Sequence, residues 1–114
     1  GGFTLIELLV VIIIIGILLA IAVPSYLGFQ ARANAAAAQA NVRSAIPAVE
    51  AYYADNNAYT SMTLTNLQAS YDAGLSSTLT VASASATTYC VSSTVGSKTY
   101  KKDGPAAQIV SGSC

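Results

Sequence analysis

The sequence has no histidine and few charged residues. Among its 114 residues, five are lysine or arginine and five are aspartate or glutamate, so the formal net charge is zero. Because these charges cancel, no overall electrostatic field favours nucleic acid or anionic lipid, and no specific nucleic-acid partner is predicted. The acidic residues are scattered, so the chain offers no plausible metal cluster and no acid–base pair. The composition therefore points away from an enzyme and predicts neither a cofactor nor a metal site.

Charge is almost absent from the N-terminal quarter of the chain. Residues 3–29 carry a single charged side chain, that of Glu7, ahead of an unbroken apolar run. As a helix, the segment from Phe3 to Leu27 would span about 37 Å, enough for the ~30 Å hydrocarbon core of a bilayer. The run is too long for the core of a signal peptide, and the rest of the chain has too little apolar surface to bury it. The sequence therefore predicts a helix that enters a membrane at some stage.

The next segment, residues 30–57, changes in composition but keeps a helical pattern. It is rich in alanine, the best helix former. Polar side chains recur on one face, and apolar side chains recur at steps of three and four on another. The apolar positions are Leu27, Ala31, Ala35, Ala38, Val42, Ala45, Val49 and Tyr52 or Tyr53. Asp-Asn-Asn at 55–57 is a stop signal, so we expect one helix over about residues 3–54.

Three residues are expected to disturb this helix. Gly16 weakens an interior helical position by about 1 kcal/mol relative to alanine. Pro24 removes a backbone donor and clashes with the preceding turn, at a cost of about 3 kcal/mol. Together they bracket residues 17–23 as the stretch most prone to bend or unwind. Pro47 falls on the polar face, where it would kink the helix without occupying the packing face.

Beyond residue 57 the sequence predicts a loop and short strands. A helical turn is expected around residues 64–70, and turn signals separate the β-type runs that follow. The expected strands are 79–83, 87–94, 97–101 and 108–111. Serines and threonines in this region are expected to form a solvated sheet face, and the basic run Lys-Thr-Tyr-Lys-Lys at 98–102 a solvated hairpin.

Together these elements predict an α+β fold. A long N-terminal helix, hydrophobic and then amphipathic, would pack with its C-terminal half against a small antiparallel β-sheet head. The expected divisions are residues 3–29 for the membrane or filament-core half, 30–57 for the amphipathic half, and 58–114 for the head. By length, all of these form one domain.

Both cysteines of the chain, Cys90 and Cys114, lie in the predicted head. We expect them to form a disulfide, which persists in an oxidising compartment. It would close a loop of about 25 residues and stabilise the fold by about 3 kcal/mol. Two free cysteines in a cytosolic protein fit poorly with the membrane segment. The head is therefore expected outside the cytoplasmic membrane.

The stretch Gly2-Phe3-Thr4-Leu5-Ile6-Glu7-Leu8, followed by the apolar run, resembles the processing site and helix of type IV pilins and their relatives. The resemblance implies that a prepilin peptidase cuts between Gly2 and Phe3, that Phe3 becomes N-methylated, and that residues 1–2 are a leader remnant. It also implies that Gly16 and Pro24 delimit the segment that loses helicity on assembly. It is strong over residues 2–29 and weaker beyond, where a disulfide near the C-terminus is similar to that of type IV pilins.

Glu7 is expected to be an assembly residue. A carboxylate buried without a partner takes up a proton unless a positive charge lies in the same apolar layer. The first basic side chain is Arg32, so the candidate is an α-amine, either of its own chain or of another subunit. An amine of Phe3 that meets Glu7 of another subunit would set the axial register of otherwise featureless leucine and isoleucine contacts.

Three functions agree with these features. The first is the structural subunit, a major pilin, of a type IV pilus that forms a helical homopolymer. It would start in inner-membrane lipid, pass through prepilin peptidase and the pilus assembly machinery, and end in an extracellular filament. The second is a major pseudopilin of a type II secretion or DNA-uptake pseudopilus; secretion pseudopilins usually carry a calcium loop near the C-terminus, where this chain offers only Asp103. The third is a bitopic membrane protein that does not polymerise, which leaves Glu7 unexplained.

Overall fold

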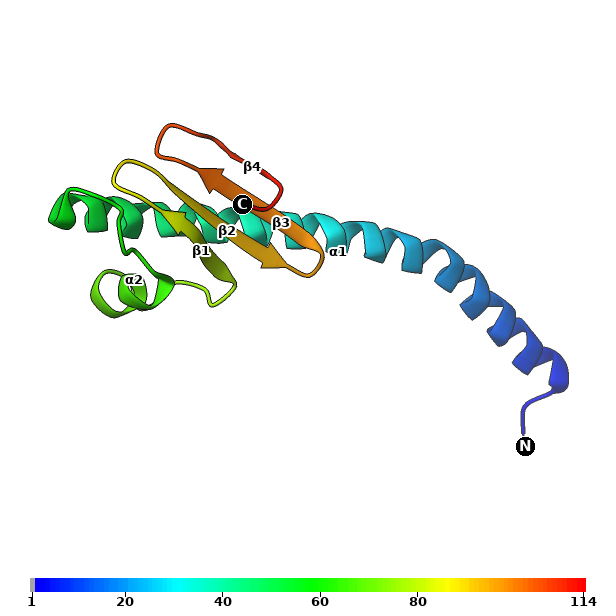
Figure 1. Ribbon diagram of the computed structural model, residues 1–114. Coiled ribbons are helices and arrows are strands. Elements are labelled where there is room, and N and C mark those ends of the chain that lie inside the picture. The colour runs from blue at the N-terminus through cyan, green and yellow to red at the C-terminus, as the bar shows by residue number, and fades with distance from the viewer. Residues whose placement is uncertain (1) are drawn as a thin grey trace. The chain divides into compact units, whose positions relative to one another are not determined.

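The computed structural model describes residues 2–114, so Gly1 of the expected leader remnant lies outside the described residues. The chain forms two helices followed by four strands (Figure 1). These are α1 (Leu5–Asn56), α2 (Leu64–Ser70), β1 (Leu79–Ala84), β2 (Tyr89–Val95), β3 (Lys98–Asp103) and β4 (Ile109–Ser111). The contacts divide the chain into two compact units, one up to Arg32 and the other from Ala33 to Cys114.

The first unit consists of the apolar part of α1. Its large side chains, from Leu5 to Phe29, are exposed throughout, and none of its most apolar window is buried within the subunit. By length and composition this part of α1 can cross a membrane. The predicted apolar helix is confirmed, beginning at Leu5 rather than at residue 3.

The second unit packs the remainder of α1 against one face of an antiparallel sheet with strand order β1-β2-β3-β4 (Figure 1). The helix contributes the residues of its apolar stripe to the core, and the strands and α2 cover them. The buried residues of α1 are Ala38, Val42, Ala45, Ala48, Val49 and Tyr52. The predicted α+β fold is therefore confirmed, as are the helical turn at Leu64–Ser70 and all four strands within a few residues.

The end of α1 is set by Asn57. This residue has a positive φ of 55°, and its N–H donates to the carbonyl of Tyr53 at 2.6 Å. Asparagine tolerates the left-handed conformation better than most residues. It is therefore found at the ends of helices, although less often than glycine. Within the predicted stop signal at 55–57, it is the backbone conformation of Asn57 that ends the helix.

Strand β2 is buried on both faces. Tyr89 and Val91 belong to the core, and Ser93, on the same face, is 1% exposed and accepts a hydrogen bond from the Asn41 side chain of α1 at 3.3 Å. The Ser93 hydroxyl also lies 2.9 Å from that of Thr78. The prediction of a solvated serine and threonine face is wrong here, because these hydroxyls join the helix to the sheet.

Lys102 is buried as well, which corrects the prediction of a solvated hairpin at 98–102. Its ammonium donates to three backbone carbonyls of the β3–β4 loop, those of Gly104 at 2.8 Å, Pro105 at 3.0 Å and Ala107 at 2.9 Å. Three donors on one ammonium match three acceptors, so the charge is buried with its hydrogen bonds satisfied. The loop is thereby tied to the strand that precedes it.

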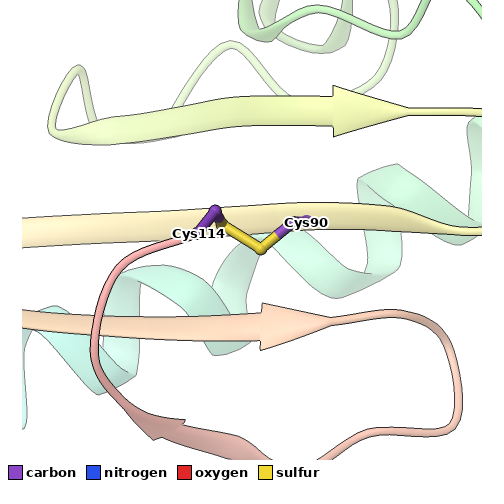
Figure 2. The surroundings of a disulfide bond; sticks show 2 residues. All are labelled: Cys90 and Cys114. Atoms are coloured by element: carbon purple, nitrogen blue, oxygen red, sulfur yellow. A yellow bond between two sulfur atoms is a disulfide. The ribbon is translucent and has the colours of Figure 1, made fainter.

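The disulfide joins Cys90 of β2 to Cys114, beyond β4 (Figure 2). Because β3 lies between β2 and β4, the C-terminal tail crosses β3 to reach β2 (Figure 2). Cys90 alternates with the core residues Tyr89 and Val91, so it points to the sheet face opposite α1. The bond therefore closes the chain over the far face of the sheet.

The β2–β3 turn approaches α1 closely at Gly96. This residue has a φ of +60°, and a Cβ at that position would lie 2.5 Å from the side-chain nitrogen of Asn34. Both the backbone conformation and the contact therefore favour glycine at this position.

We expect Gly96→Ala to lower the free energy of unfolding by about 2 kcal/mol, through backbone strain and the clash with Asn34. The measurement is denaturation of the full chain in detergent, followed by tyrosine fluorescence. In an Asn34→Ala background only the backbone strain remains, so the same substitution should cost about half as much. An equal loss in both backgrounds would show that the Asn34 contact is not a cause.

Candidate functional site

The residues predicted for processing and assembly lie at the start of α1. Gly2 and Phe3 precede the helix, and Phe3 is 87% exposed, so the predicted cleavage position is accessible in a single subunit. Glu7 lies in the first turn of α1. A carboxylate there interacts favourably with the positive end of the helix dipole.

Thr4 and Glu7 form a capping box. The Glu7 N–H donates to the Thr4 hydroxyl oxygen at 3.2 Å, and the Thr4 N–H donates to a Glu7 carboxylate oxygen at 3.4 Å. This reciprocal arrangement satisfies two of the N–H groups that a helix start leaves unpaired. A threonine followed three residues later by a glutamate is the sequence signal of a capping box. The sequence prediction gave Glu7 an assembly role only and did not include this local one.

The capping box also directs the Glu7 carboxylate. It turns the carboxylate toward the N-terminal end of the chain, onto the backbone N–H that directly follows Phe3. A carboxylate in apolar surroundings is stabilised by any hydrogen-bond donor to its charged form. The single subunit therefore gives Glu7 a donor of its own, beside the position where an amine of Phe3 would lie.

The predicted weak points of α1 are helical in the single subunit. Residues 17–23 are α-helical, and the helix runs through Gly16, Pro24 and Pro47. Next to Pro24, the Ser25 hydroxyl donates to the carbonyl of Ile21 at 3.3 Å. Loss of helicity concerns the assembled state, so the bracket formed by Gly16 and Pro24 stays a prediction, as does a kink at Pro47.

A second functional candidate is Glu50 on the exposed side of α1. The buried hydroxyl of Tyr59 donates to its carboxylate, with the two oxygens at 3.1 and 3.4 Å. Burial and the contact with Glu50 raise the pKa of Tyr59 to about 12. The Tyr59 ring packs between those of Tyr53 and Tyr89 in tilted arrangements, each with a centroid distance of 4.7 Å. Glu50 therefore has an exposed carboxylate whose position is fixed by a hydrogen bond from the core residue Tyr59.

Comparison with known proteins agrees with this geometry. Residues 1–23 match the sequence profile described as the prokaryotic N-terminal methylation motif. The chain is 44% identical over 95 residues to the type IV wide pilus major component PilA4 of Thermus thermophilus, an overlap that covers 79% of this chain and 70% of that protein.

Two further relatives match mainly over the helix. The type IV major pilin protein PilA of Myxococcus xanthus is 43% identical over 58 residues, which is 51% of this chain and 26% of that protein. The type II secretion system core protein G of Pseudomonas aeruginosa is 40% identical over 61 residues, which is 54% of this chain and 43% of that protein. These relatives are named as components of pili and of a secretion system.

An exposed apolar helix that begins with this motif and ends under a four-stranded sheet defines a subunit of the prepilin type. The chain belongs to the type IV pilin family. The family expected from the N-terminal motif is thereby confirmed.

We expect Thr4→Ala to loosen the start of α1, because the hydroxyl acceptor of the capping box is lost. A cap of this kind is worth about 1 kcal/mol, which corresponds to an increase of about fivefold in amide exchange. The measurement is hydrogen exchange at residues 5–8 of the full chain in detergent micelles. Thr4→Ser keeps the hydroxyl and should behave like the unaltered chain, whereas equal exchange in both variants would contradict the capping role.

The raised pKa of Tyr59 predicts a loss of stability at alkaline pH. The folded state holds the phenol proton more tightly than the unfolded chain, whose tyrosine has a pKa near 10. The stabilisation is therefore complete below pH 10 and is lost as the pH rises from about 10 to about 12. Burial raises the pKa of Tyr89 and adds to the loss in the same direction.

Unfolding measured by circular dichroism across this pH range should show the decrease in stability. Tyr59→Phe should make the decrease shallower, because it removes one of the tyrosines whose pKa is raised in the folded state. Tyr26→Phe, which changes an exposed tyrosine of the first unit, is the matched control and should leave the slope unchanged. A slope that stays the same in Tyr59→Phe would assign the alkaline transition to other groups.

Proposed function

We propose that this chain is a structural subunit, a major pilin, that polymerises through α1 into an extracellular type IV pilus and performs no catalysis. The observation that supports this most is the first unit, whose large apolar side chains are all exposed in the single subunit. A helix that is apolar on every side needs surroundings of lipid or of other helices. Lipid meets this need before assembly, and copies of the same helix meet it afterwards.

In this proposal the precursor is anchored in the cytoplasmic membrane with its second unit outside. A prepilin peptidase cleaves between Gly2 and Phe3, and the new amine of Phe3 is methylated. The methylation motif at residues 1–23 and the exposure of Phe3 support this order of events. The pilus components among the relatives support the extracellular filament as the product.

Glu7 then recruits and registers each subunit. The amine of an incoming Phe3 replaces a neutral N–H donor with a positive charge, which is a stronger partner for a carboxylate in apolar surroundings. Because each subunit offers its amine to one neighbour and its Glu7 carboxylate to another, the contact is heterologous and builds an open fibre rather than a closed ring. Unwinding between Gly16 and Pro24 would let the helix adjust its length to the rise of the fibre.

The alternative is a major pseudopilin of a type II secretion or DNA-uptake pseudopilus. It is supported by the likeness to type II secretion system core protein G, at 40% identity over about half of this chain. The pilus is favoured because the relative with the widest overlap shown above, PilA4, is a pilus component. The tail of the second unit is also secured by the pair Cys90–Cys114, and residues 2–114 hold no group of three or more acidic, histidine or cysteine side chains that could hold a metal.

The test compares Glu7→Ala with the unaltered chain in cells. Both should insert in the membrane and be cleaved, but Glu7→Ala should give at least about tenfold fewer fibres in electron micrographs of sheared material, since ~1.4 kcal/mol per contact already changes incorporation tenfold. Asp103→Ala, which removes an exposed carboxylate from β3, is the matched control and should assemble normally.

Equal fibre yield and length in Glu7→Ala would overturn the assembly role of Glu7. If the unaltered chain gave no long extracellular fibres but supported protein secretion, the pseudopilin alternative would replace the pilus. Intact mass and N-terminal sequencing of the sheared material would show whether the subunit begins at methylated Phe3.

A further inference from the structure

The second half of α1 has an exposed stripe that the sheet does not cover. Its members lie three or four residues apart along the helix, on the side opposite the core face. The α1 stripe consists of Ala33, Ala36, Ala40, Arg43, Ser44, Pro47, Glu50 and Ala54. All but two of these side chains are small and uncharged, so a second helix could approach closely along the stripe.

The two charged members of the stripe, Arg43 and Glu50, are opposite in sign and cannot pair with each other. Residues seven apart lie on the same face but about 10 Å apart along the axis, whereas side-chain pairs within a helix form at three or four residues. Among residues 2–114 the structure contains no ion pair, so Arg43 has no carboxylate partner there. Its charge is available for another chain.

Glu50 is prepared to accept such a partner. The hydroxyl of Tyr59, a residue that is 2% exposed, fixes the carboxylate from the core side at 3.1 and 3.4 Å. An ionised carboxylate has about four acceptor positions, so positions remain on the solvent side. A fixed carboxylate loses less conformational entropy on binding than a free one.

The charges of the stripe select one arrangement of two copies. If all copies enter the membrane in the same direction, as the proposed function requires, their α1 helices run parallel. Parallel helices at the same height would place Arg43 beside Arg43 and Glu50 beside Glu50, which is repulsive. A displacement of seven residues instead places Arg43 of one copy at the height of Glu50 of the next.

We propose that the α1 stripe is a contact between copies of this chain, displaced by about 10 Å along the helix, in which Arg43 of one copy pairs with Glu50 of the next. The inference rests on the proposed function, because it needs a polymer. Each subunit then uses Arg43 toward one neighbour and Glu50 toward another, so the contact propagates along a fibre. It is independent of Glu7, which acts at the other end of α1.

Charge reversal tests the pairing. Arg43→Glu should reduce sheared fibre yield about fivefold or more, since reversal replaces an attraction by a repulsion of about 1 kcal/mol or more per contact. The double variant Arg43→Glu with Glu50→Arg should restore most of the yield. Lys98→Glu with Asp103→Lys makes the same exchange of charges on β3, away from the stripe, and should assemble normally. Circular dichroism of each variant checks that it is folded.

Crosslinking gives a second measurement that does not depend on fibre yield. In sheared fibres, Arg43→Cys with Glu50→Cys should give a ladder of multimers with a short bismaleimide. Arg43→Cys alone has one free thiol per subunit and can give at most a dimer; it should give no dimer, because two copies at the same height are excluded. Arg43→Cys with Ala36→Cys repeats the displacement of seven residues one step lower along α1 and should give a ladder as well.

The outcomes separate this inference from the proposed function. Fibres that form normally in Arg43→Glu, or crosslinked dimers from Arg43→Cys alone, would overturn the stripe contact while leaving the pilus intact. If the unaltered chain forms no fibres at all, both fail. If fibre yield is normal in the stripe variants but falls in Glu7→Ala, the contact at Glu7 alone sets the axial register of the subunits, and the stripe contact is overturned.

Discussion

The structure depends on how the apolar surface of α1 is covered. From Ala38 to Tyr52 the core face of the helix lies against the sheet and contributes to the core of the second unit. From Leu5 to Phe29 the apolar side chains surround the helix, and nothing in the subunit covers them. One helix therefore has one part whose burial is completed within the chain and another whose burial requires lipid or other chains. Folding and assembly are thus separate events along a single element.

The second unit is small, and polar contacts contribute much of its order. Hydroxyls and an amide join Ser93 to Asn41, the Lys102 ammonium holds the β3–β4 loop, and a disulfide secures the tail over β3. The contact of Ser93 joins the sheet to α1, the Lys102 contacts tie β3 to the loop that follows it, and the disulfide joins β2 to the tail. A domain of this size gains little from hydrophobic burial alone, so such links have a large share in its stability.

Much of this structure was predictable, because the strongest signals were local. Periodicity located the core face of α1, and turn residues located the four strands, since both depend on spacing along the chain. The burial of Ser93 was not predictable in this way, because it depends on the contact between β2 and α1. The Lys102 contacts are local, but they depend on how the β3–β4 loop folds back on β3, which spacing along the chain does not indicate. The capping box of Thr4 and Glu7 was predictable from the local spacing of threonine and glutamate. The assembly role of Glu7 concerns other subunits and stays a prediction. The hold of Tyr59 on Glu50 joins residues of the helix and the loop that follows it, and no spacing rule indicates it.

The environment of Lys102 affects how fibres of this chain could be marked for microscopy. All three protons of its ammonium are engaged by carbonyls, and the side chain is buried. Amine-reactive dyes attack the free, deprotonated amine at the surface, so the accessible lysines are Lys98 and Lys101 on the same strand. Both lie on β3, outside the β3–β4 loop that Lys102 holds. Fluorophores attached there would label β3 and leave the Lys102 contacts of the β3–β4 loop intact.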